Sequence, residues 1–411
     1  MTAETLPQWP HRTLSGAGSA SVPLRQFVIK VHSRCNLACT YCYVYRSPDQ
    51  SWRERPVRVA PETMARTAQR IGEHAHTHGL RRIRLELHGG EPLLAGPEPL
   101  LEQVRAVRLA VPADCEVASS VQTNGTLLTG PVLDRLATEG IRVGLSLDGG
   151  SARLNRRRVG HGGASSWPGV ARAADLLARR GGTQYAGILS TIDLNSEPGE
   201  VYGSLLELGP PALDFLLPHA NWGAPPVGLP PALPGRHRPG PAPYGQWLAE
   251  VFDLWWQAEG VRTEVRLFTE ILALLLGWAS AAEAVGLSPM VAVVVDTDGA
   301  IEQVDSLKSA YPGAPETGLD VFANSFDEAL RHPGIAARQL GEEGLSIECR
   351  ACPVLRVCGG GNYAHRYAPT SGFLHPSVYC ADLELLIRHI ARRLGGVPVR
   401  QGSPEGGDAS V

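Results

Sequence analysis

The sequence predicts an α/β protein in which six parallel strands and their helices form a partial (β/α)6 barrel, followed by a smaller cysteine-rich domain. Strand-like and helix-like segments alternate from residue 26 to residue 218, polar or glycine-rich segments follow several strands, and seven of the eight cysteines lie in two tight groups. Strands that alternate with helices form a parallel sheet with right-handed crossovers. A chain of 411 residues with 43% hydrophobic residues can bury the core that such a barrel needs.

Each strand is expected where β-branched and apolar residues concentrate, and each helix where apolar residues recur with helical periodicity. The carboxyl ends of parallel strands meet at one edge of a sheet, where such folds bind their ligands. Residues that directly follow a strand are therefore candidates for a site. The expected strands are 26–31, 82–87, 116–122, 141–147, 184–192 and 213–218, and the expected helices are 61–79, 98–110, 130–139, 166–180 and 197–208.

The segments outside the barrel are expected to differ in kind. Eight prolines lie between residues 221 and 243, which is typical of a linker or a long surface loop. A helix with aromatic residues spaced for core packing (Trp247, Phe252, Trp255 and Trp256) follows, and another helix is expected near 264–278. A β-hairpin around Asp298-Gly299 and a last helix at 381–394 come after them. The predicted parts are a flexible arm at 1–22, the barrel at 23–220, the Pro-rich loop and bridging helices at 221–285, the cysteine-rich domain at 286–395 and a disordered tail at 396–411.

Composition argues against several classes of partner. The net charge is −3, so nucleic-acid binding is not expected. No apolar run approaches the ~20 residues that a membrane span needs, so no membrane partner is expected either. The polar N-terminal stretch lacks the apolar core of a signal peptide. The expected location is the cytoplasm, where cysteines serve metal binding or catalysis more often than disulfides.

The stretch from Cys35 to Cys42 holds the strongest motif. Its three cysteines, Cys35, Cys39 and Cys42, have the spacing Cys-x3-Cys-x2-Cys and could bind one iron–sulfur cluster or one soft metal ion. Three thiolates leave one iron of a [4Fe–4S] cluster open for a cofactor or substrate. A zinc knuckle completed by a distant residue is the alternative, although zinc sites usually pair cysteines as Cys-x2-Cys or combine them with histidines.

Four segments together resemble the cofactor motifs of the radical S-adenosylmethionine (SAM) superfamily. The first is the cysteine motif with Tyr41 before its last cysteine, and each of the others follows an expected strand. The resemblance implies that SAM binds the open iron, that Glu91 and backbone groups meet the SAM amino group, and that the later segments contact the rest of SAM. These segments are His88-Gly89-Gly90-Glu91-Pro92, Thr123-Asn124-Gly125 and Ser146-Leu147-Asp148-Gly149.

The same resemblance implies the chemistry. One electron from an external reductant would enter the cluster and cleave SAM, and the 5′-deoxyadenosyl radical would abstract a hydrogen atom from an unactivated carbon. Walls that exclude water would protect that radical. Arg156, Arg157 and Arg158 follow the fourth strand; they could meet the SAM carboxylate or a peptide, with Arg158 the assigned cofactor contact, or form a solvated basic face.

The second cysteine group contains four thiols, which by spacing alone suit zinc or a complete [4Fe–4S] cluster. The pattern resembles the C-terminal SPASM extension of peptide-modifying radical SAM enzymes, whose outer auxiliary cluster has such ligands. Val304 and Asn362 stand where that extension has cysteines of an inner cluster. The resemblance therefore implies one auxiliary cluster, and two [4Fe–4S] clusters in all. The four residues are Cys349, Cys352, Cys358 and Cys380.

Asp305 is the candidate catalytic base. It ends the segment 298–305, which resembles the Asp-Gly-x4-Cys-Asp segment of that family. In sulfatase-maturing relatives the matching aspartate is the proposed base near the substrate, and a carboxylate there could take a proton as the substrate is oxidised. A hairpin salt bridge or turn cap is the alternative. Weaker candidates of the same kind are Glu302, Asp296 and His219.

Most of residues 25–392 resembles the Fxs-type radical SAM/SPASM proteins, which act on ribosomally made precursor peptides. Several of these form a cyclophane by joining an aromatic ring carbon to the Cβ of a residue two positions on. The first hypothesis is therefore a maturase that forms such a crosslink by hydrogen abstraction, attack on the ring, and loss of one electron and one proton. The segments that carry this resemblance include 42–45, 49–52, 216–220, 301–308 and 358–367.

Two kinds of alternative remain open. On the same scaffold, the modification could be thioether formation, epimerisation or oxidation of Ser or Cys to formylglycine, and the absent inner-cluster cysteines weigh mildly against the last. The alternative of another class is a non-catalytic iron–sulfur or zinc-binding protein. The sequence does not predict the precursor peptide or how its leader is recognised.

Overall fold

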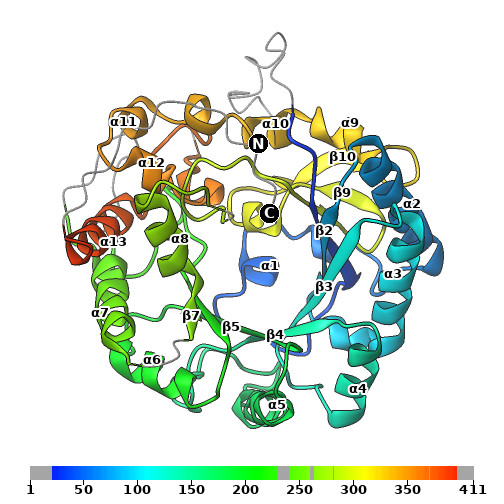
Figure 1. The fold of residues 1–411 in the computed structure, drawn as a ribbon, viewed down its shortest axis with the longest axis horizontal. Coiled ribbons are helices and arrows are strands. Elements are labelled where there is room, and N and C mark those ends of the chain that lie inside the picture. Colours follow the sequence, from blue (N-terminus) through cyan, green and yellow to red (C-terminus); the bar gives the residue numbers. More distant parts are fainter. Residues whose placement is uncertain (1–20, 230–239, 260–262, 281, 370, 396–411) are drawn as a thin grey trace.

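A single mixed sheet organises the computed structural model, which describes residues 21–229, 240–259, 263–280, 282–369 and 371–395. Its ten strands within these residues run in the order β10-β9-β8-β1-β2-β3-β4-β5-β6-β7. Strands β1 to β6 are parallel to one another. In Figure 1 they curve around a central space, with helices α2 to α6 outside them. The predicted α/β partial barrel is therefore confirmed.

The boundaries of these elements lie within a few residues of the predicted ones. Each of the helices α2 to α6 has a proline in its first two positions, where the fixed φ suits a helix and the missing N–H breaks no helical bond. The elements are β1 (Gln26–His32), α2 (Pro61–Thr77), β2 (Arg82–Gly89), α3 (Pro97–Ala110), β3 (Glu116–Thr123), α4 (Gly130–Thr138), β4 (Arg142–Ser146), α5 (Trp167–Arg180), β5 (Tyr185–Thr191), α6 (Pro198–Leu206) and β6 (Ala212–Leu216).

Alternation along the strands separates an apolar outer face from a polar inner one. On β1, Phe27 and Ile29 are buried, and the Phe27 ring packs against Phe326 with centroids 4.9 Å apart. Lys30 points to the opposite face because successive side chains of a strand alternate. Polar contacts also join neighbouring strands, since Gln122 Nε2 donates to Ser146 Oγ at 2.7 Å. The barrel interior can therefore hold charged and polar groups.

The predicted hairpin is present, and it continues the barrel sheet. Strand β8 (Ala292–Val295) pairs in parallel with β1, β9 (Ala300–Glu302) pairs antiparallel with β8, and β10 (Glu316–Asp320) forms the edge. Gly299 makes the turn with a φ of 92°, a value that favours glycine. This pairing brings the turn segment 296–305 next to β1.

At the other edge, the sheet gains a short strand, β7 (Glu264–Val265), which the sequence did not indicate. The helices α7 (Pro243–Gln257) and α8 (Arg266–Leu275) flank it, and Trp247 and Trp255 are buried as their spacing predicted. The remaining elements are α1 (Tyr43–Arg46), α9 (Phe326–Leu330), α10 (Pro333–Ala337), α11 (Ile347–Arg350), α12 (Leu355–Cys358), α13 (Cys380–Arg393) and the 3-10 helices η1 (Ser51–Arg53), η2 (Pro92–Ala95), η3 (Asp305–Ser309), η4 (Gly341–Gly344) and η5 (Tyr363–Arg366).

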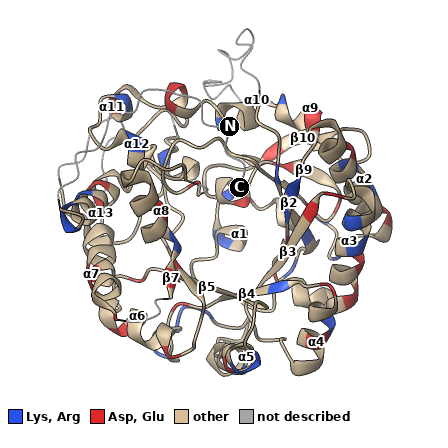
Figure 2. Cartoon of the chain, viewed as in Figure 1, with Lys and Arg blue, Asp and Glu red and all other residues tan. Residues whose placement is uncertain are grey.

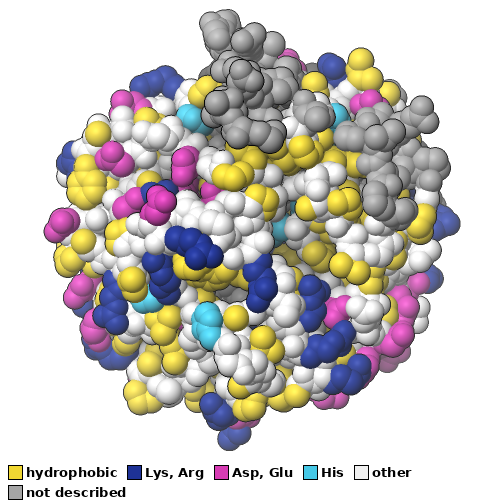
Figure 3. Space-filling view, turned by 180° about the vertical axis from the view of Figure 1, so that it is seen from behind, with side chains coloured by type: hydrophobic (Ala, Val, Ile, Leu, Met, Phe, Trp, Pro, Cys, Tyr) yellow, Lys and Arg dark blue, Asp and Glu magenta, His cyan; other side chains and the backbone are white. Residues whose placement is uncertain are grey.

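Some predicted features lie outside the described residues: most of the N-terminal arm, residues 230–239 of the Pro-rich segment, and the tail from 396 onward. Among the described helices, none combines the length and apolar character needed to cross a bilayer. Acidic and basic residues are mixed along the outer helices (Figure 2), and Lys and Arg side chains also lie across the middle of the opposite face (Figure 3). The predicted boundaries between the barrel, the bridging helices and the cysteine-rich domain stay predictions. One sheet contains strands from all three of these parts.

Candidate active site

The cysteine motif forms a loop after β1 that is anchored to the segment following β4. The main-chain N–H groups of Ala38 and Thr40 donate to the carbonyls of Val159 and Arg157, at 2.7 and 2.9 Å. Helix α1 begins directly after Cys42. Two separate chain segments thus fix the loop at the carboxyl end of the barrel strands.

In both cysteine groups, the sulfur atoms lie farther apart than the ligands of a single zinc ion do. All eight cysteines are free thiols. In a tetrahedral zinc site the sulfur atoms lie about 3.8 Å apart, because Zn–S bonds are about 2.3 Å long. Among the described residues, only His74, His78 and Asp327 bring three metal-ligand atoms within 4.8 Å of one another, so neither cysteine group does. The sulfur atoms of either group would therefore have to move closer together to bind a single zinc ion.

The thiols of the first group are largely withdrawn from water. Burial raises the pKa of Cys35 to about 12 and also raises the pKa values of Cys39 and Cys42. Cluster ligands must be thiolates, so a bound cationic cluster is what would hold these groups deprotonated. The Cys35 Sγ accepts from the main-chain N–H of Leu37 at 3.4 Å, and the Asn124 Nδ2 lies 3.7 Å from it.

The pair Gly89-Gly90 lies against the chain entering the cysteine loop. The Gly90 N–H donates to the His32 carbonyl at 2.8 Å. A Cβ on Gly90 would overlap the Tyr45 hydroxyl and lie 2.5 Å from the Arg34 carbonyl oxygen. Glycine is needed here because the two backbones approach too closely for a side chain. Pro92 follows as the first residue of η2.

Glu91 is fully buried, and its carboxylate bonds to the chain itself. Its Oε1 accepts from the Leu93 N–H at 3.0 Å and from the Thr123 hydroxyl at 2.7 Å, while Oε2 accepts from the Asn124 N–H at 2.8 Å. Burial raises the pKa of Glu91, and these hydrogen bonds oppose the rise. The carboxylate therefore joins the end of β2 to the end of β3. Its contact with the SAM amino group stays a prediction.

Asn124 joins the end of β3 to the cysteine loop. Its Nδ2 donates to Asn36 Oδ1 at 2.9 Å. Its Oδ1 accepts from the main-chain N–H and the hydroxyl of Thr126, at 3.0 and 2.6 Å. Asn36 also donates to the Thr126 hydroxyl at 2.9 Å. The predicted segment 123–125 thus lies directly beside the first cluster cysteine.

Tyr41, Asp148 and Arg158 meet in one buried cluster, although the sequence predicted them only as separate cofactor contacts. The Tyr41 hydroxyl donates to the Asp148 carboxylate at 2.6–2.7 Å. The Arg158 Nη1 donates to the Tyr41 oxygen at 2.7 Å and lies 3.8 Å from Asp148 Oδ1. Burial raises the pKa of Asp148, and the Arg158 charge opposes that effect. The cluster ties the cysteine loop to the end of β4.

The other two arginines of the basic run have separate contacts. Arg156 forms an ion pair with Asp193 at 2.6 Å. Arg157 lies over the Tyr41 ring, 4.6 Å from its centroid. Because the Arg158 side chain is only 12% exposed and bonds to Tyr41, the run does not form the uniform solvated face that was one of the sequence alternatives.

The four cysteines of the second group line a pocket between α11, α12 and α13. Beside it, the Arg366 guanidinium donates to the carbonyls of Gly359, Gly360 and Gly361 at 2.7–3.1 Å. Burial lowers the pKa of Arg366, whereas the nearby Cys349 and Cys358 thiols act to raise it. A guanidinium beside four cysteines would offset the negative charge of several thiolates.

Two residues stand where the SPASM extension has cysteines of an inner cluster, and both make other contacts. Val304 is the N-cap residue of η3. Asn362 caps η5, where its Oδ1 accepts from the Ala364 N–H at 3.0 Å, and its Nδ2 donates to Glu283 at 3.4 Å. Neither side chain is a soft ligand, so these residues do not support an inner cluster at this place.

Asp305 belongs to a buried network of charges rather than to a salt bridge within the hairpin. The Lys30 Nζ lies 2.7 Å from Asp305 Oδ1, 2.7 Å from Asp296 and 3.4 Å from Glu302. The contact with Asp305 is an ion pair without hydrogen-bond alignment, since Oδ1 has no hydrogen-bond partner. Burial lowers the pKa of Lys30, and the three carboxylates more than reverse this. The partner of Asp305 thus comes from β1.

Aromatic side chains pack against one another next to the cysteine loop. Tyr43 follows Cys42, and its ring meets His219 edge-on with centroids 4.4 Å apart. His365 lies 5.5 Å beyond His219. Burial lowers the pKa of His219 to about 4, and His219 Nδ1 and His365 Nε2 are buried without hydrogen-bond partners. Burial therefore keeps both imidazoles neutral at neutral pH.

Sequence reasoning gave Lys30, Tyr43 and His365 no individual role. Lys30 could have been found, because a lysine inside an apolar strand at an inward position of the period-2 pattern is unusual. The other two gave no local signal, because their contacts join segments far apart in the chain.

Comparison with known proteins agrees with this geometry. Residues 29–195 match the family model of the Radical SAM superfamily. The matched segment holds the cysteine loop and the ends of β2, β3 and β4.

Over nearly its whole length, the chain is similar to anaerobic sulfatase-maturating enzymes. It is 25% identical over 390 residues to the serine-type enzyme of Klebsiella aerogenes, covering 93% of this chain and 91% of that protein. It is 24% identical over 381 residues to the cysteine-type enzyme of Clostridium perfringens (strain 13 / Type A), covering 90% and 97%. The structure of native anSMEcpe with bound AdoMet shares the fold, with a TM-score of 0.74, 23% identity and coverage of 91% and 99%. These comparisons do not single out the Fxs type, which stays a prediction.

Proposed function

We propose that this chain is a radical SAM maturase that oxidises a side chain of a peptide substrate, in the first instance Ser or Cys to formylglycine. The observation that carries the proposal is the packing of η3, which begins with Asp305, on α1, which directly follows the last cysteine of the motif. A carboxylate beside the cysteine loop suits an oxidation that releases a proton. The similarity to sulfatase-maturating enzymes over at least 90% of the chain supports the same reaction class.

The residues present suit the expected cofactors. Cys35, Cys39 and Cys42 would hold one [4Fe–4S] cluster and leave an iron for SAM, and the second cysteine group would hold an auxiliary cluster. When bound, the first cluster and SAM supply a 5′-deoxyadenosyl radical that takes a hydrogen atom from the substrate carbon. An external one-electron reductant is required for each turnover. The bonds of Glu91 and of the Tyr41–Asp148–Arg158 cluster hold the strand ends that would surround SAM.

Oxidation of a serine substrate balances with the groups available. One hydrogen atom leaves Cβ, then one electron and the hydroxyl proton leave, and the C–O bond becomes a carbonyl. Asp305 would accept the proton, and Lys30 holds the carboxylate in place from 2.7 Å away. The electron needs an acceptor, and an oxidised iron–sulfur cluster is the class of acceptor that the second cysteine group offers. Tyr43 and His219 would form the wall against the substrate.

A second candidate is the aromatic ring-to-Cβ crosslink predicted from the Fxs-type resemblance. It is favoured by Val304 and Asn362, because the chain lacks thiolates where the full extension has its inner cluster. The reaction would begin with the same hydrogen abstraction at Cβ, after which the carbon attacks an aromatic ring and the ring loses one electron and one proton. Both candidates use Asp305 as the proton acceptor.

Two further modifications and a cellular location complete the proposal. Thioether formation would also remove two hydrogens, whereas epimerisation would leave the mass unchanged. The proposed location is the cytoplasm, because none of the eight cysteines forms a disulfide and cysteines that serve metal binding are typical of a reducing compartment.

The deciding experiment compares products. Holoenzyme with both clusters reconstituted is incubated with SAM, dithionite and a candidate peptide encoded next to its gene, and the peptide is analysed by tandem mass spectrometry before and after treatment with a hydrazide. Oxidation of Ser predicts loss of two hydrogens and a hydrazide adduct. Loss of two hydrogens without an adduct, together with a ring-to-Cβ linkage, would select the crosslink. An unmodified peptide mass with residue inversion would reject both candidates.

A further inference from the structure

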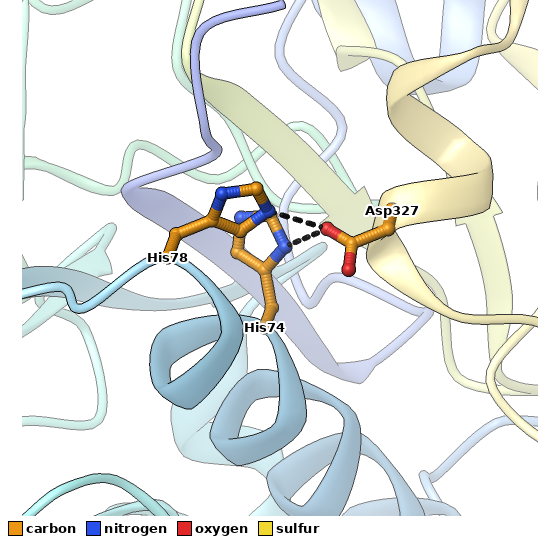
Figure 4. A group of neighbouring side chains, drawn as sticks. All are labelled: His74, His78 and Asp327. Carbon is orange, nitrogen blue, oxygen red and sulfur yellow. Dashed lines mark hydrogen bonds and ion pairs between the residues drawn. The ribbon is translucent and has the colours of Figure 1, made fainter.

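Two histidines and one aspartate meet on the outer side of the barrel, on elements that carry neither cysteine group. His74 and His78 lie four residues apart at the end of α2, and Asp327 lies in α9 (Figure 4). The i, i+4 spacing puts both imidazoles on one face of the helix. Among the described residues, this is the group whose three potential metal-ligand atoms all lie within 4.8 Å of one another.

One carboxylate oxygen faces both rings. Asp327 Oδ1 lies 2.7 Å from His74 Nδ1 and 2.7 Å from His78 Nε2. Burial lowers the pKa of His74. Burial acts to raise the pKa of Asp327, but hydrogen bonds from the two histidines bring it below its usual value. At neutral pH the group therefore combines a neutral imidazole with an ionised carboxylate, which are the forms that bind a metal ion.

The second nitrogen of His74 gives an independent indication. Its Nε2 is buried and makes no well-aligned hydrogen bond, although the backbone of Leu24 lies close enough to the ring to oppose the lowering of its pKa. A neutral His74 that donates through Nδ1 to Asp327 leaves Nε2 as a bare lone pair in this buried place. A metal ion on Nδ1 moves the ring proton to Nε2, where it can be donated to a carbonyl, as is typical of metal-bound histidines.

The geometry allows a zinc ion with a small opening of the group. Zn–N and Zn–O bonds of about 2.0–2.2 Å put the ligand atoms of a tetrahedral site about 3.3 Å apart, so the 2.7 Å contacts must open by about 0.6 Å. The His78 and Asp327 side chains are 26% and 33% exposed and can move outward. His74 is 1% exposed and is held against the Phe27 and Phe326 rings.

We infer that His74, His78 and Asp327 form a zinc site that joins α2 of the barrel to α9 of the C-terminal part. Two imidazoles and one carboxylate are a donor set that suits zinc, and the fourth position would be filled by water. Each ligand comes from a different turn or element, so the ion would hold these two helices together. This inference stands apart from the proposed reaction.

The test measures zinc bound to the holoenzyme after both cysteine groups have been filled with iron–sulfur clusters. The protein is dialysed against zinc chloride in buffer without chelator, and zinc per chain is determined by elemental analysis. Wild-type protein should bind one zinc ion more than His78→Ala, and zinc should raise the Tm of wild-type protein but not of the variant. Asp327→Asn, which keeps the shape of the side chain, should lose the same zinc ion.

The matched control is His76→Ala, because His76 is an exposed histidine on the same helix and is not part of the group. It should bind as much zinc as wild-type protein. Equal zinc content in wild-type protein and in both the His78→Ala and Asp327→Asn variants would overturn the inference and would mean that the three side chains form a hydrogen-bonded contact only.

Discussion

Asp305 shows how one residue can depend on a partner from the other end of the chain. Its side chain is largely buried, and a buried carboxylate is costly unless a cation compensates it. Lys30 supplies that charge from β1, at 2.7 Å. The same lysine also contacts Asp296 and Glu302, so the network keeps two carboxylate partners when Asp305 is changed. An isosteric substitution can therefore test its chemistry without leaving Lys30 unpaired.

Asp305→Asn is expected to separate SAM cleavage from product formation. The variant keeps the shape of the side chain but cannot accept a proton, so modified peptide should fall by roughly 10²–10⁴-fold, as is usual for loss of a general base. Formation of 5′-deoxyadenosine should continue. Both products are measured in the same reaction by chromatography.

The control for this variant is Asp253→Asn, because Asp253 lies on α7 with His389 and Arg393 as partners. That variant should behave like wild-type protein. If Asp305→Asn loses 5′-deoxyadenosine and modified peptide to the same extent, Asp305 has a structural role and is not the proton acceptor.

Spacing along the chain made the cluster cysteines and the strand-end residues predictable as single positions. It did not reveal what those residues contact. The sequence treats Glu91, Thr123 and Asn124 as parallel contacts to one cofactor, whereas the fold makes Glu91 the link between the other two. Likewise, 266 residues separate Lys30 from Asp296, and no local pattern reports a contact over that distance.

At the scale of elements, the end of β2 and the cysteine loop are built as one unit. The chain at Gly90 passes so close to Arg34 and Tyr45 that a single added carbon has no space. The loop therefore depends on the shape of β2 as much as on its own sequence.

Gly90→Ala is expected to displace the cysteine loop. Overpacking of this kind costs about 1–3 kcal/mol of stability. The variant should therefore unfold at lower denaturant concentration and retain less of the first cluster after reconstitution, measured by iron content and visible absorbance.

Gly130→Ala is the matched control, since a Cβ there meets nothing within 4 Å and the residue begins α4. Its stability and cluster content should equal those of wild-type protein. Wild-type cluster content in Gly90→Ala would contradict the packing argument.

Periodicity predicted the elements of the barrel well because each strand and helix has one apolar face. It could not reveal β7, which has two residues and exists through its pairing with β6. Nor could it show that β8 pairs with β1, because a strand carries the same alternation whichever neighbour it has.

At the scale of the whole molecule, one sheet connects the barrel to the hairpin and the network around Asp305. The second cysteine group lies near Arg366, in the C-terminal part of the chain, and lines a separate pocket. The chain thus offers two separate groups of cysteines, one in the loop after β1 and one in the C-terminal part, and the proposed function assigns an iron–sulfur cluster to each.

Iron analysis tests that arrangement. Reconstituted protein should contain about eight iron and eight sulfide ions per chain, as two [4Fe–4S] clusters require. The double variant Cys349→Ser/Cys352→Ser should contain about four of each, because it retains the first cluster alone. Zinc in place of iron at the second group of freshly purified protein would contradict the auxiliary-cluster assignment.

The most direct test of the whole account is the cleavage of SAM. Holoenzyme that is reduced with dithionite under anaerobic conditions and given SAM should release 5′-deoxyadenosine and methionine, and Cys39→Ala should release neither above background. This result would follow from a cluster on Cys35, Cys39 and Cys42 with SAM at its open iron. If wild-type protein releases no more 5′-deoxyadenosine than Cys39→Ala, the chain is not a radical SAM enzyme and the account is wrong.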